Sequence, residues 1–251
     1  MKRVMGVVAV AWLTVAFNSA YAGLYGFGTG TQGWTALRVG GEITSMYLEG
    51  IGGANILVSY DDPEGEPSDA QCFVYNMESN KVIDIYNSGG PPVYPEGIDG
   101  NNVVGTGGMD PGNFLCPGLT VNQEKWIRFN YPDAHSTYAW DISGDNIAGG
   151  YVDDAGLHGF IYNYKENNWT SFDYPGARYT DALSISGNKI VGYYQDANGG
   201  HSFLYNNSEW ITLNYPGARS TWAHGIDGNN IVGYYRDFSF NEHGFIYVEN
   251  H

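Results

Sequence analysis

The feature that most constrains the fold of this chain is an internal repeat that occurs five times. Three copies are closely similar, and they lie at residues 126–163, 169–205 and 210–247. Each of them begins with Trp, continues through Tyr-Pro and Thr-x-Ala, and ends in His-(Gly/Ser)-Phe. Two more divergent copies precede them, at about residues 34–75 and 82–116. A period of this kind indicates that the fold is an assembly of five similar units.

One isoleucine marks the same position in every copy. These anchor residues are Ile51, Ile98, Ile142, Ile185 and Ile226. The spacings between them are 47, 44, 43 and 41 residues. Around each anchor, short runs of Ile, Val, Tyr and Phe are separated by sequences such as Asp-Gly-Asn-Asn, which are typical of strands joined by tight hairpin turns. No sustained helical period follows the first 22 residues, so each unit reads as a small antiparallel sheet.

Repeats of about 41–47 residues with three or four strands predict the blades of a β-propeller. We therefore expect an all-β fold in which residues 23–251 form a single five-bladed β-propeller. The strand predicted at 229–235 has consecutive apolar residues, so both of its faces should be buried, which fits a blade packed between two others. An open β-solenoid is the alternative, although its coils are usually shorter and lack repeated hairpin turns.

The first 22 residues have the pattern of a secretory signal peptide. Lys2 and Arg3 precede an apolar run at 4–17, and a small-x-small signal ends at Ala22. The apolar run is too short to span a bilayer comfortably, and no later segment reaches about 18 apolar residues. We expect cleavage near Ala22, a secreted or periplasmic protein, and no membrane span.

The charge of the chain excludes some partners. It has 27 acidic and 11 basic side chains, for a formal net charge of -16. Proteins that bind nucleic acid need clustered Lys and Arg to displace counterions, and anionic membranes attract basic segments. We therefore expect neither a nucleic-acid binder nor a protein of anionic membrane surfaces.

The repeat motifs resemble a known family. Tyr-Pro-Gly-Ala, Ile-x-Gly-(Asn/Asp)-x-Ile-Val-Gly-Tyr-Tyr and His-Gly-Phe-Ile-Tyr are similar to the bacterial extracellular repeats of the HAF type. The match is specific over residues 126–247 and looser over 34–116. The resemblance implies an exported bacterial repeat protein and implies little about activity.

Thr and His recur together in the three similar copies and are both missing from the first two. The pairs are Thr137 with His158, Thr180 with His201, and Thr221 with His243. The simplest account is a hydrogen bond from the Thr hydroxyl to the imidazole, which ties strands within a blade and is extended by Asp154, Asp196 and Asp237. Three equivalent ligand pockets are the alternative.

Other positions keep the repeat frame but change residue. Two residues before the anchors stand Glu49, Glu96, Trp140, Leu183 and His224. Four residues before them stand Tyr47, Tyr94, Tyr138, Asp181 and Trp222. By the two-residue period of a strand, both sets share a face with the anchor isoleucine. If this strand is innermost in each blade, they gather at one mouth of a central channel; the alternative is packing between blades.

These residue types favour a sugar ligand, because aromatic rings stack on sugar C–H faces and carboxylates bind hydroxyl groups. The candidate ligand-binding residues are Tyr47, Glu49, Tyr94, Glu96, Tyr138, Trp140, Trp222 and His224. We expect a secreted recognition module for a glycan or cell-surface polymer. Two alternatives stay open: a structural protein of surface assembly, and a glycan-cleaving hydrolase whose carboxylates are Glu49, Glu96 and Asp141.

Two further features concern metal binding and disulfides. An acidic loop with candidate calcium ligands contains Asp61, Asp62, Glu64, Glu66 and Asp69. It lacks the spacing of an EF-hand, and a solvated hairpin tip is the alternative, so no cofactor is expected. The two cysteines, Cys72 and Cys116, can pair in an exported chain.

Overall fold

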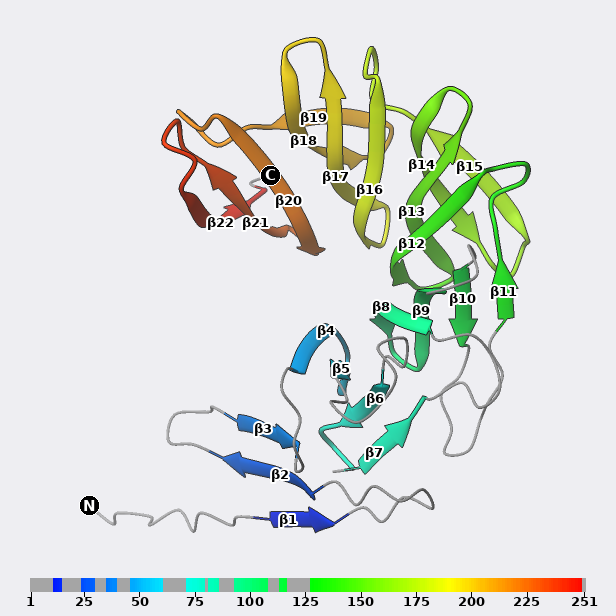
Figure 1. The fold of residues 1–251 in the computed structure, drawn as a ribbon, viewed down its shortest axis with the longest axis vertical. Coiled ribbons are helices and arrows are strands. Elements are labelled where there is room, and N and C mark those ends of the chain that lie inside the picture. Colours follow the sequence, from blue (N-terminus) through cyan, green and yellow to red (C-terminus); the bar gives the residue numbers. More distant parts are fainter. Residues whose placement is uncertain are drawn as a thin grey trace. The chain divides into compact units, whose positions relative to one another are not determined.

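The computed structural model describes most of the chain in detail. The described residues are 11–14, 24–29, 35–39, 46–60, 71–79, 81–85, 93–107, 113–116 and 127–249. All regular elements among them are β-strands (Figure 1). Within these ranges, no apolar helix has the length that a bilayer crossing requires. The chain divides into two compact units, residues 1–47 with 60–71 and residues 48–59 with 72–251.

The first unit contains a three-stranded antiparallel sheet. Its strands are β1 (Ala11–Thr14), β2 (Leu24–Thr29) and β3 (Thr35–Val39), in the order β1-β2-β3. The strand β1 is the only part of the expected signal peptide that lies within the described residues.

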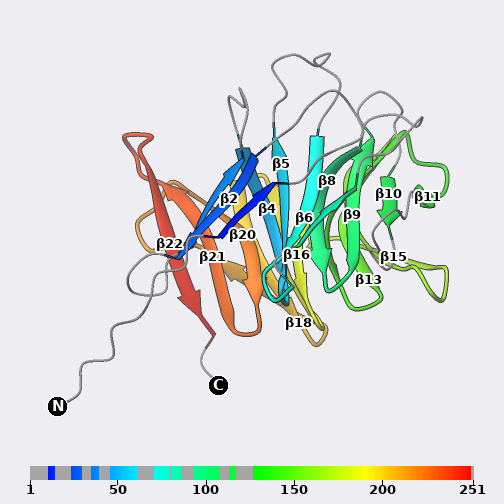
Figure 2. The same ribbon diagram turned by 90° about the horizontal axis from the view of Figure 1, so that it is seen from below.

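Most of the second unit consists of four-stranded antiparallel sheets. The first of these sheets contains β4 (Met46–Gly52), β5 (Asn55–Tyr60), β6 (Gln71–Asn76) and β7 (Lys81–Asp84). The second contains β8 (Val93–Asp99), β9 (Asn102–Gly107), β10 (Asn113–Cys116) and β11 (Ile127–Phe129). The third sheet contains β12 (Ser136–Ser143), β13 (Asn146–Asp153), β14 (Gly156–Asn163) and β15 (Asn168–Phe172). The fourth contains β16 (Tyr179–Ser186), β17 (Lys189–Asp196), β18 (Gly199–Asn206) and β19 (Glu209–Leu213). The strands β20 (Ser220–Asp227), β21 (Asn230–Arg236) and β22 (Glu242–Val248) form a last, three-stranded sheet. Figure 2 shows strands of successive sheets standing side by side.

The expectation of an all-β propeller built from repeats is confirmed, but the number of blades is wrong. The structure has four complete four-stranded blades instead of five. The reason is that the Trp strand at the start of each repeat pairs with the preceding blade: Trp169 of β15 lies opposite Tyr162 of β14, and Trp210 of β19 lies opposite Tyr205 of β18. Among the described residues, the sheet of the fifth repeat therefore has three strands, β20–β22, in place of four.

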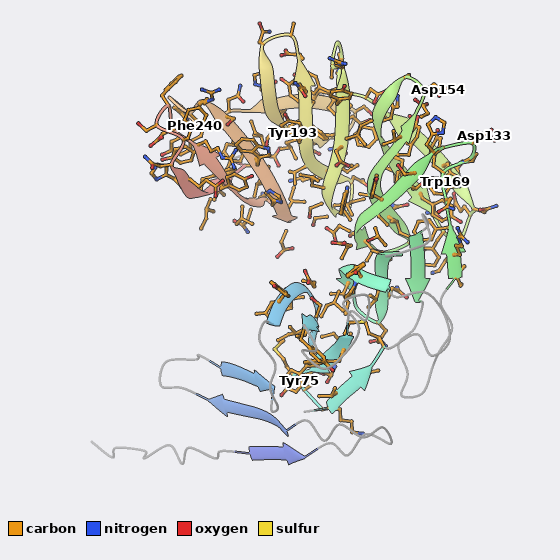
Figure 3. All side chains as sticks on the ribbon, viewed as in Figure 1. Tyr75, Asp133, Asp154, Trp169, Tyr193 and Phe240 are labelled. Carbon is orange, nitrogen blue, oxygen red and sulfur yellow. The ribbon has the colours of Figure 1, made fainter. Side chains whose placement is uncertain are left out.

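Aromatic packing forms much of the interior of the blades β12–β15 and β16–β19. In the sheet β12–β15, the buried core includes Ile142, Ile147, Phe160 and Tyr162, and Trp169 packs against it (Figure 3). The indole stacks on Tyr162 at 4.0 Å between ring centroids and meets Phe160 edge-on at 5.1 Å. Burying one such aromatic side chain stabilises a fold by about 1.5–3 kcal/mol, so the recurring Trp helps to hold these two blades together.

Neighbouring sheets are joined through their first strands. The strand β8 packs against β12, β12 against β16, and β16 against β20. A repeated hydrogen bond supports these contacts, because a side chain just after the anchor accepts the turn N–H of the next sheet. These bonds are Gly144 N to Asp99 Oδ2 (2.6 Å), Gly187 N to Ser143 Oγ (3.1 Å) and Gly228 N to Ser186 Oγ (3.0 Å).

Glycine allows the closest of these approaches. A Cβ atom on Gly52 would lie 2.8 Å from the backbone nitrogen of Gly100, and one on Gly97 would lie 2.7 Å from the Cα atom of Asp141. Both distances are shorter than Cβ contacts in proteins. The first strands of neighbouring sheets therefore pack backbone against backbone, which places the anchor positions of different repeats close to one another.

Candidate ligand-binding cavity

The second unit contains a cavity of about 780 Å³ that is lined by the first strand of every sheet. Residues of β4, β8, β12, β16 and β20 line it, and these sheets follow one another in sequence order (Figure 1). The lining includes all five anchor residues, Ile51, Ile98, Ile142, Ile185 and Ile226. Equivalent positions of the five repeats therefore meet around one shared space.

The positions two residues before the anchors also line this cavity. They are Glu49, Glu96, Trp140, Leu183 and His224. In four of the strands this residue is the extra residue of a β-bulge: in β12, Ala139 pairs with Gly149 and Asp141 pairs with Ala148, which leaves Trp140 without a pair. The same shift occurs in β8, β16 and β20. A bulge redirects a side chain and often lies beside a functional site, and here it places the variable residue at the cavity.

The positions four residues before the anchors behave differently. Tyr94, Tyr138 and Trp222 do not belong to the cavity lining. The expectation that they share a face with the anchor is wrong, because the extra residue of the bulge interrupts the two-residue period of the strand before the anchor is reached. Tyr47 is 51% exposed and belongs to the first unit.

Glu49 and Glu96 form a pair of interacting carboxylates at the cavity. Burial, and to a smaller extent the negative charge of Glu49, raise the pKa of Glu96 to about 7. The hydroxyl of Thr106 donates to Glu96 Oε1 at 3.4 Å and acts in the opposite direction. The hydroxyl of Ser59 donates to Glu49 Oε1. Glu96 is therefore partly protonated near neutral pH.

Asp141 lines the same cavity, but its oxygens are used to join two sheets. Its Oδ2 atom accepts the Ser184 hydroxyl at 2.6 Å and the Ile185 N–H at 3.0 Å, and its Oδ1 atom accepts the Ile142 N–H at 2.8 Å. Burial raises the pKa of Asp141, and these hydrogen bonds oppose that rise. The geometry gives Asp141 a structural role, and its place as a third carboxylate in the hydrolase alternative stays a prediction.

Trp140 is fixed in the cavity wall by a residue that sequence reasoning missed. Its indole N–H donates to Asp181 Oδ1 at 2.9 Å, and its ring stacks on Tyr138 at 5.6 Å with 6° between the planes. Burial raises the pKa of Asp181 to about 6. The sequence did contain a sign of this role, because Asp181 is an acidic residue at a position that is Tyr or Trp in the other four repeats.

A second aromatic group lies beside the cavity, on β20 and its neighbours. Trp222 stacks on Tyr234 at 4.9 Å, and the Arg236 guanidinium lies 5.1 Å from the Trp222 ring centre. Tyr193 on β17 is parallel to the same ring at 6.3 Å (Figure 3). His224, which lines the cavity, stacks on Tyr234 at 5.4 Å. This stack connects Trp222 to the cavity only through Tyr234 and His224.

The recurring Thr and His residues lie elsewhere in the blades, and they bind different partners. The Thr hydroxyls accept the backbone N–H of the Tyr-Pro tyrosine. The bonds run from Tyr131 to Thr137 (3.0 Å), from Tyr174 to Thr180 (3.0 Å) and from Tyr215 to Thr221 (2.9 Å). The structure thus replaces the expected Thr-to-imidazole hydrogen bond with a bond that fixes the Tyr-Pro turn.

The imidazoles bind aspartates instead. The Nδ1 atom of His158 lies 3.0 Å from the carboxylate of Asp173, and its Nε2 atom lies 3.2 Å from the carboxylate of Asp153. Asp154, the residue expected from the sequence, is at the tip of the β13–β14 hairpin and binds His135 at 2.8 Å (Figure 3). His201 and His243, by contrast, contact the expected residues Asp196 and Asp237.

In the later repeats, His201 Nε2 lies 3.4 Å from Asp196, and His243 Nε2 lies 3.1 Å from Asp237. The hydrogen bond from His243 is the main cause that lowers the pKa of Asp237 to about 2. Each of the three imidazoles also stacks on a tyrosine of the adjacent strand, at 5.0–5.2 Å. These groups fill the outer part of each repeat and do not contribute to the cavity.

Some predicted site residues fall outside the described residues. The acidic loop with Asp61, Asp62, Glu64, Glu66 and Asp69 is one such segment. Cys72 is buried on β6 and Cys116 ends β10, but the side chain of Cys116 is not described. Calcium binding by this loop and the Cys72–Cys116 disulfide therefore stay predictions.

Comparison with known proteins agrees with the fold. The structure is similar to the β-propeller domain of the Trilobed protease from Pyrococcus furiosus, with a TM-score of 0.60, 11% identity, and coverage of 90% of this chain and 75% of that chain. It is also similar to the acylaminoacyl peptidase of Pyrococcus horikoshii (TM-score 0.59, 12% identity, 90% of this chain and 42% of that chain). A third similar structure is TolB from Acinetobacter baumannii, with a TM-score of 0.57, 10% identity, and coverage of 90% of this chain and 60% of that chain.

At these identities the likeness establishes a propeller fold and nothing about activity. The chain spans less than half of the Pyrococcus horikoshii peptidase, so that enzyme contains a large part with no counterpart here. No protein-family model and no curated protein matches the sequence. The resemblance to HAF-type repeats therefore stays a prediction.

Proposed function

We propose that this protein is an exported recognition module whose central cavity binds a carbohydrate. The observation that carries the proposal is that the variable position of all five repeats lines one cavity: Glu49, Glu96, Trp140, Leu183 and His224. A position that keeps the repeat frame while its chemistry changes is expected where a ligand is bound, since packing alone favours similar side chains in similar repeats.

The size and chemistry of the cavity suit a short oligosaccharide. Its volume of about 780 Å³ lies within the range of about 300–1,000 Å³ that is typical of small-molecule sites. Trp140 offers a ring whose orientation is held by Asp181, and such rings stack on sugar C–H faces. The carboxylates of Glu49 and Glu96 supply acceptors for hydroxyl groups. A bound sugar would therefore meet both an aromatic ring and carboxylate acceptors.

Binding to a glycan array, followed by calorimetric titration of the hits, tests this function. We expect micromolar to millimolar binding that Trp140→Ala weakens at least tenfold, because the main stacking surface is lost. Tyr179→Ala is the matched control, since it removes a partly exposed aromatic ring outside the cavity lining. An array without hits, or equal binding by both variants, would contradict the proposal.

A second candidate function is hydrolysis of a glycosidic bond. The observation that favours it is the carboxylate pair itself: a general acid needs a pKa near the working pH, and the pKa of Glu96 is raised to about 7 beside Glu49. In this alternative Glu96 protonates the leaving oxygen, while Glu49 acts as the nucleophile or activates water.

The two functions differ in the effect of one substitution. If the protein is a hydrolase, Glu96→Gln abolishes turnover of any glycan that the wild type cleaves. If it only binds glycans, Glu96→Gln still binds a neutral glycan. Release of reducing ends from the array hits, measured for both proteins, separates them. A wild-type protein that binds a hit without cleaving it over a long incubation would exclude the hydrolase.

A further inference from the structure

The cavity holds negative charge that no described cation neutralises. Its lining contains five carboxylates, Glu49, Glu96, Asp99, Asp141 and Asp227. Among the described residues, neither Lys nor Arg belongs to this lining. Asp99 and Asp141 accept backbone N–H groups, which offset part of their charge. The hydrogen bonds given above for Glu49 and Glu96 come from hydroxyl groups, which carry no charge.

This arrangement is unfavourable until a positive group enters. Two like charges at a half-buried site repel, and burial weakens the hydration that would otherwise stabilise them. A cation that binds between Glu49 and Glu96 removes both penalties. The site therefore has a stronger preference for a charged ligand than its polar surface alone would give.

We propose that the ligand presents a positively charged amine to Glu49 and Glu96 while its ring stacks on Trp140, so that its class is an oligosaccharide of amino sugars with free amines. This inference rests on the proposed function, because it assumes that the cavity binds a sugar, and it adds the charge that the sugar carries.

A bound metal ion accounts less well for the same charges. Among the described residues, no group of three or more His, Cys, Asp and Glu side chains is placed to hold a metal ion. The cavity is also far larger than one ion and includes the indole of Trp140. An ammonium group on a ring satisfies both parts of this wall, since it pairs with carboxylates and is attracted to aromatic faces.

The pH dependence of binding follows from the groups that face Glu96. Glu49 on β4 and Thr106 on β9 act on Glu96 directly, and the other titratable groups of the cavity lining include Asp99, Asp141 and His224. A cation binds the deprotonated form of Glu96, whose pKa is about 7 in the free protein. Affinity for an amine that stays charged should therefore rise as pH increases from 5.5 to 7.5. A neutral sugar should show no such rise.

The test is calorimetric titration of the full protein with three probes at pH 7: a β-1,4-linked glucosamine tetrasaccharide, its fully N-acetylated counterpart, and spermidine. We expect the free-amine tetrasaccharide to bind at least tenfold more tightly than the acetylated one. Spermidine should bind more weakly than the amino sugar, because it lacks a ring for Trp140, and its affinity should rise with pH.

Two variants and a control localise the effect. Glu49→Gln and Glu96→Gln should each weaken binding of the free-amine probe about tenfold, because each removes one charge-assisted contact. Each should weaken binding of the acetylated probe less, so that the preference for the amine falls. Glu166→Gln makes the same charge change in an exposed turn and should change neither. Circular dichroism checks the fold of each variant, and the selectivity of the wild-type protein between probes decides the question even if a variant does not fold.

The possible failures are distinguishable. If the acetylated probe binds as tightly as the free amine, or both Gln variants keep their preference for the amine, the inference is wrong while the proposed function stands. If spermidine binds and neither sugar does, the charge preference stands and the carbohydrate function is wrong. If no probe binds, both are wrong.

Discussion

Two regions of the repeats differ in how much their side chains vary from one repeat to the next. In the outer region, a Tyr-Pro tyrosine stacks on a strand tyrosine in three successive repeats, at ring-centre distances of 3.6, 3.7 and 3.8 Å. A Thr that accepts the turn N–H and a His that stacks on the strand tyrosine accompany each pair. Nearly identical chemistry and geometry in three places indicate a structural unit that stabilises the fold.

At the cavity, the repeat frame carries Glu in the first two repeats and Trp, Leu and His in the other three. Glu96, Trp140 and His224 have little in common except their position at a β-bulge. The comparison suggests that the outer stacks carry stability and the bulge positions carry recognition. Substitutions in the first region should therefore change unfolding and spare binding, and substitutions in the second should do the reverse.

The largest effect is expected from breaking one outer stack. Tyr194 is 5% exposed and stacks on both Tyr174 and His201, so Tyr194→Ala should lower the free energy of unfolding by about 3–5 kcal/mol. Tyr138→Ala, at a ring that is 37% exposed, should cost less than about 1 kcal/mol. Urea denaturation measures both. Similar losses for the two variants would show that the outer stack has no special role.

The next effect concerns the bonds between sheets. Asp141→Ala removes the acceptor of the Ser184 hydroxyl and of two backbone N–H groups, so it should cost about 2–4 kcal/mol. Asp227→Ala changes an exposed carboxylate at the same cavity and should stay within about 0.5 kcal/mol of the wild type. Thermal unfolding of both proteins at pH 7 checks the difference. An unchanged melting temperature for Asp141→Ala would contradict its structural role.

A smaller effect is expected from the Tyr-Pro turn. Thr180 is fully buried and accepts the N–H of Tyr174 at 3.0 Å. Thr180→Val keeps the shape of the side chain and leaves that N–H without its acceptor, so it should cost about 1–2 kcal/mol. Thr180→Ser, which keeps the hydroxyl, should recover most of this loss. If Ser and Val destabilise equally, the hydrogen bond is not what makes Thr necessary.

The smallest effect on stability is expected at the cavity, and it depends on pH. The pKa of Glu96 is raised in the folded protein, so folding favours the protonated form. The stabilisation is complete below about pH 4.3, the pKa of an unperturbed glutamate, and is lost as pH rises towards 7. Glu96→Gln removes this dependence and should be more stable than the wild type at pH 8 by about 1 kcal/mol, after allowance for its partial exposure.

Unfolding free energies of wild type and Glu96→Gln at pH 5 and pH 8 check this sign. The difference between the two proteins should grow with pH. A wild-type protein that gains stability relative to Glu96→Gln as pH rises would mean that Glu96 has a cationic partner in the folded state.

The sequence was sufficient for the fold class and for the location of the cavity. The fivefold spacing of anchors such as Ile142 and Ile185 predicted repeated sheets around a shared space, because a constant register places equivalent residues in equivalent positions. It was not sufficient for the blade count. Whether the Trp169 strand pairs with its own repeat or the preceding one depends on contacts with β14 that no local pattern encodes.

The bulge explains the main error at the site. Strict alternation placed Tyr138 and Trp140 on the same face as the anchor, but the extra residue breaks that alternation. A Cβ atom on Gly149 would lie 1.9 Å from the Tyr138 carbonyl oxygen, so this glycine is required where β13 approaches the bulge. Glycine at the equivalent Gly192 and Gly233 was a visible signal of a close backbone approach. Its consequence for side-chain direction could be seen only in three dimensions.

The central claim is that the five repeats build one ligand site rather than several. The stoichiometry of a calorimetric titration with the glucosamine tetrasaccharide tests it most directly. We predict one bound tetrasaccharide per chain, with affinity reduced by Trp140→Ala and unchanged by His201→Ala. Three bound molecules per chain, with binding lost one site at a time as His158, His201 and His243 are replaced, would place recognition in the outer stacks and contradict the account.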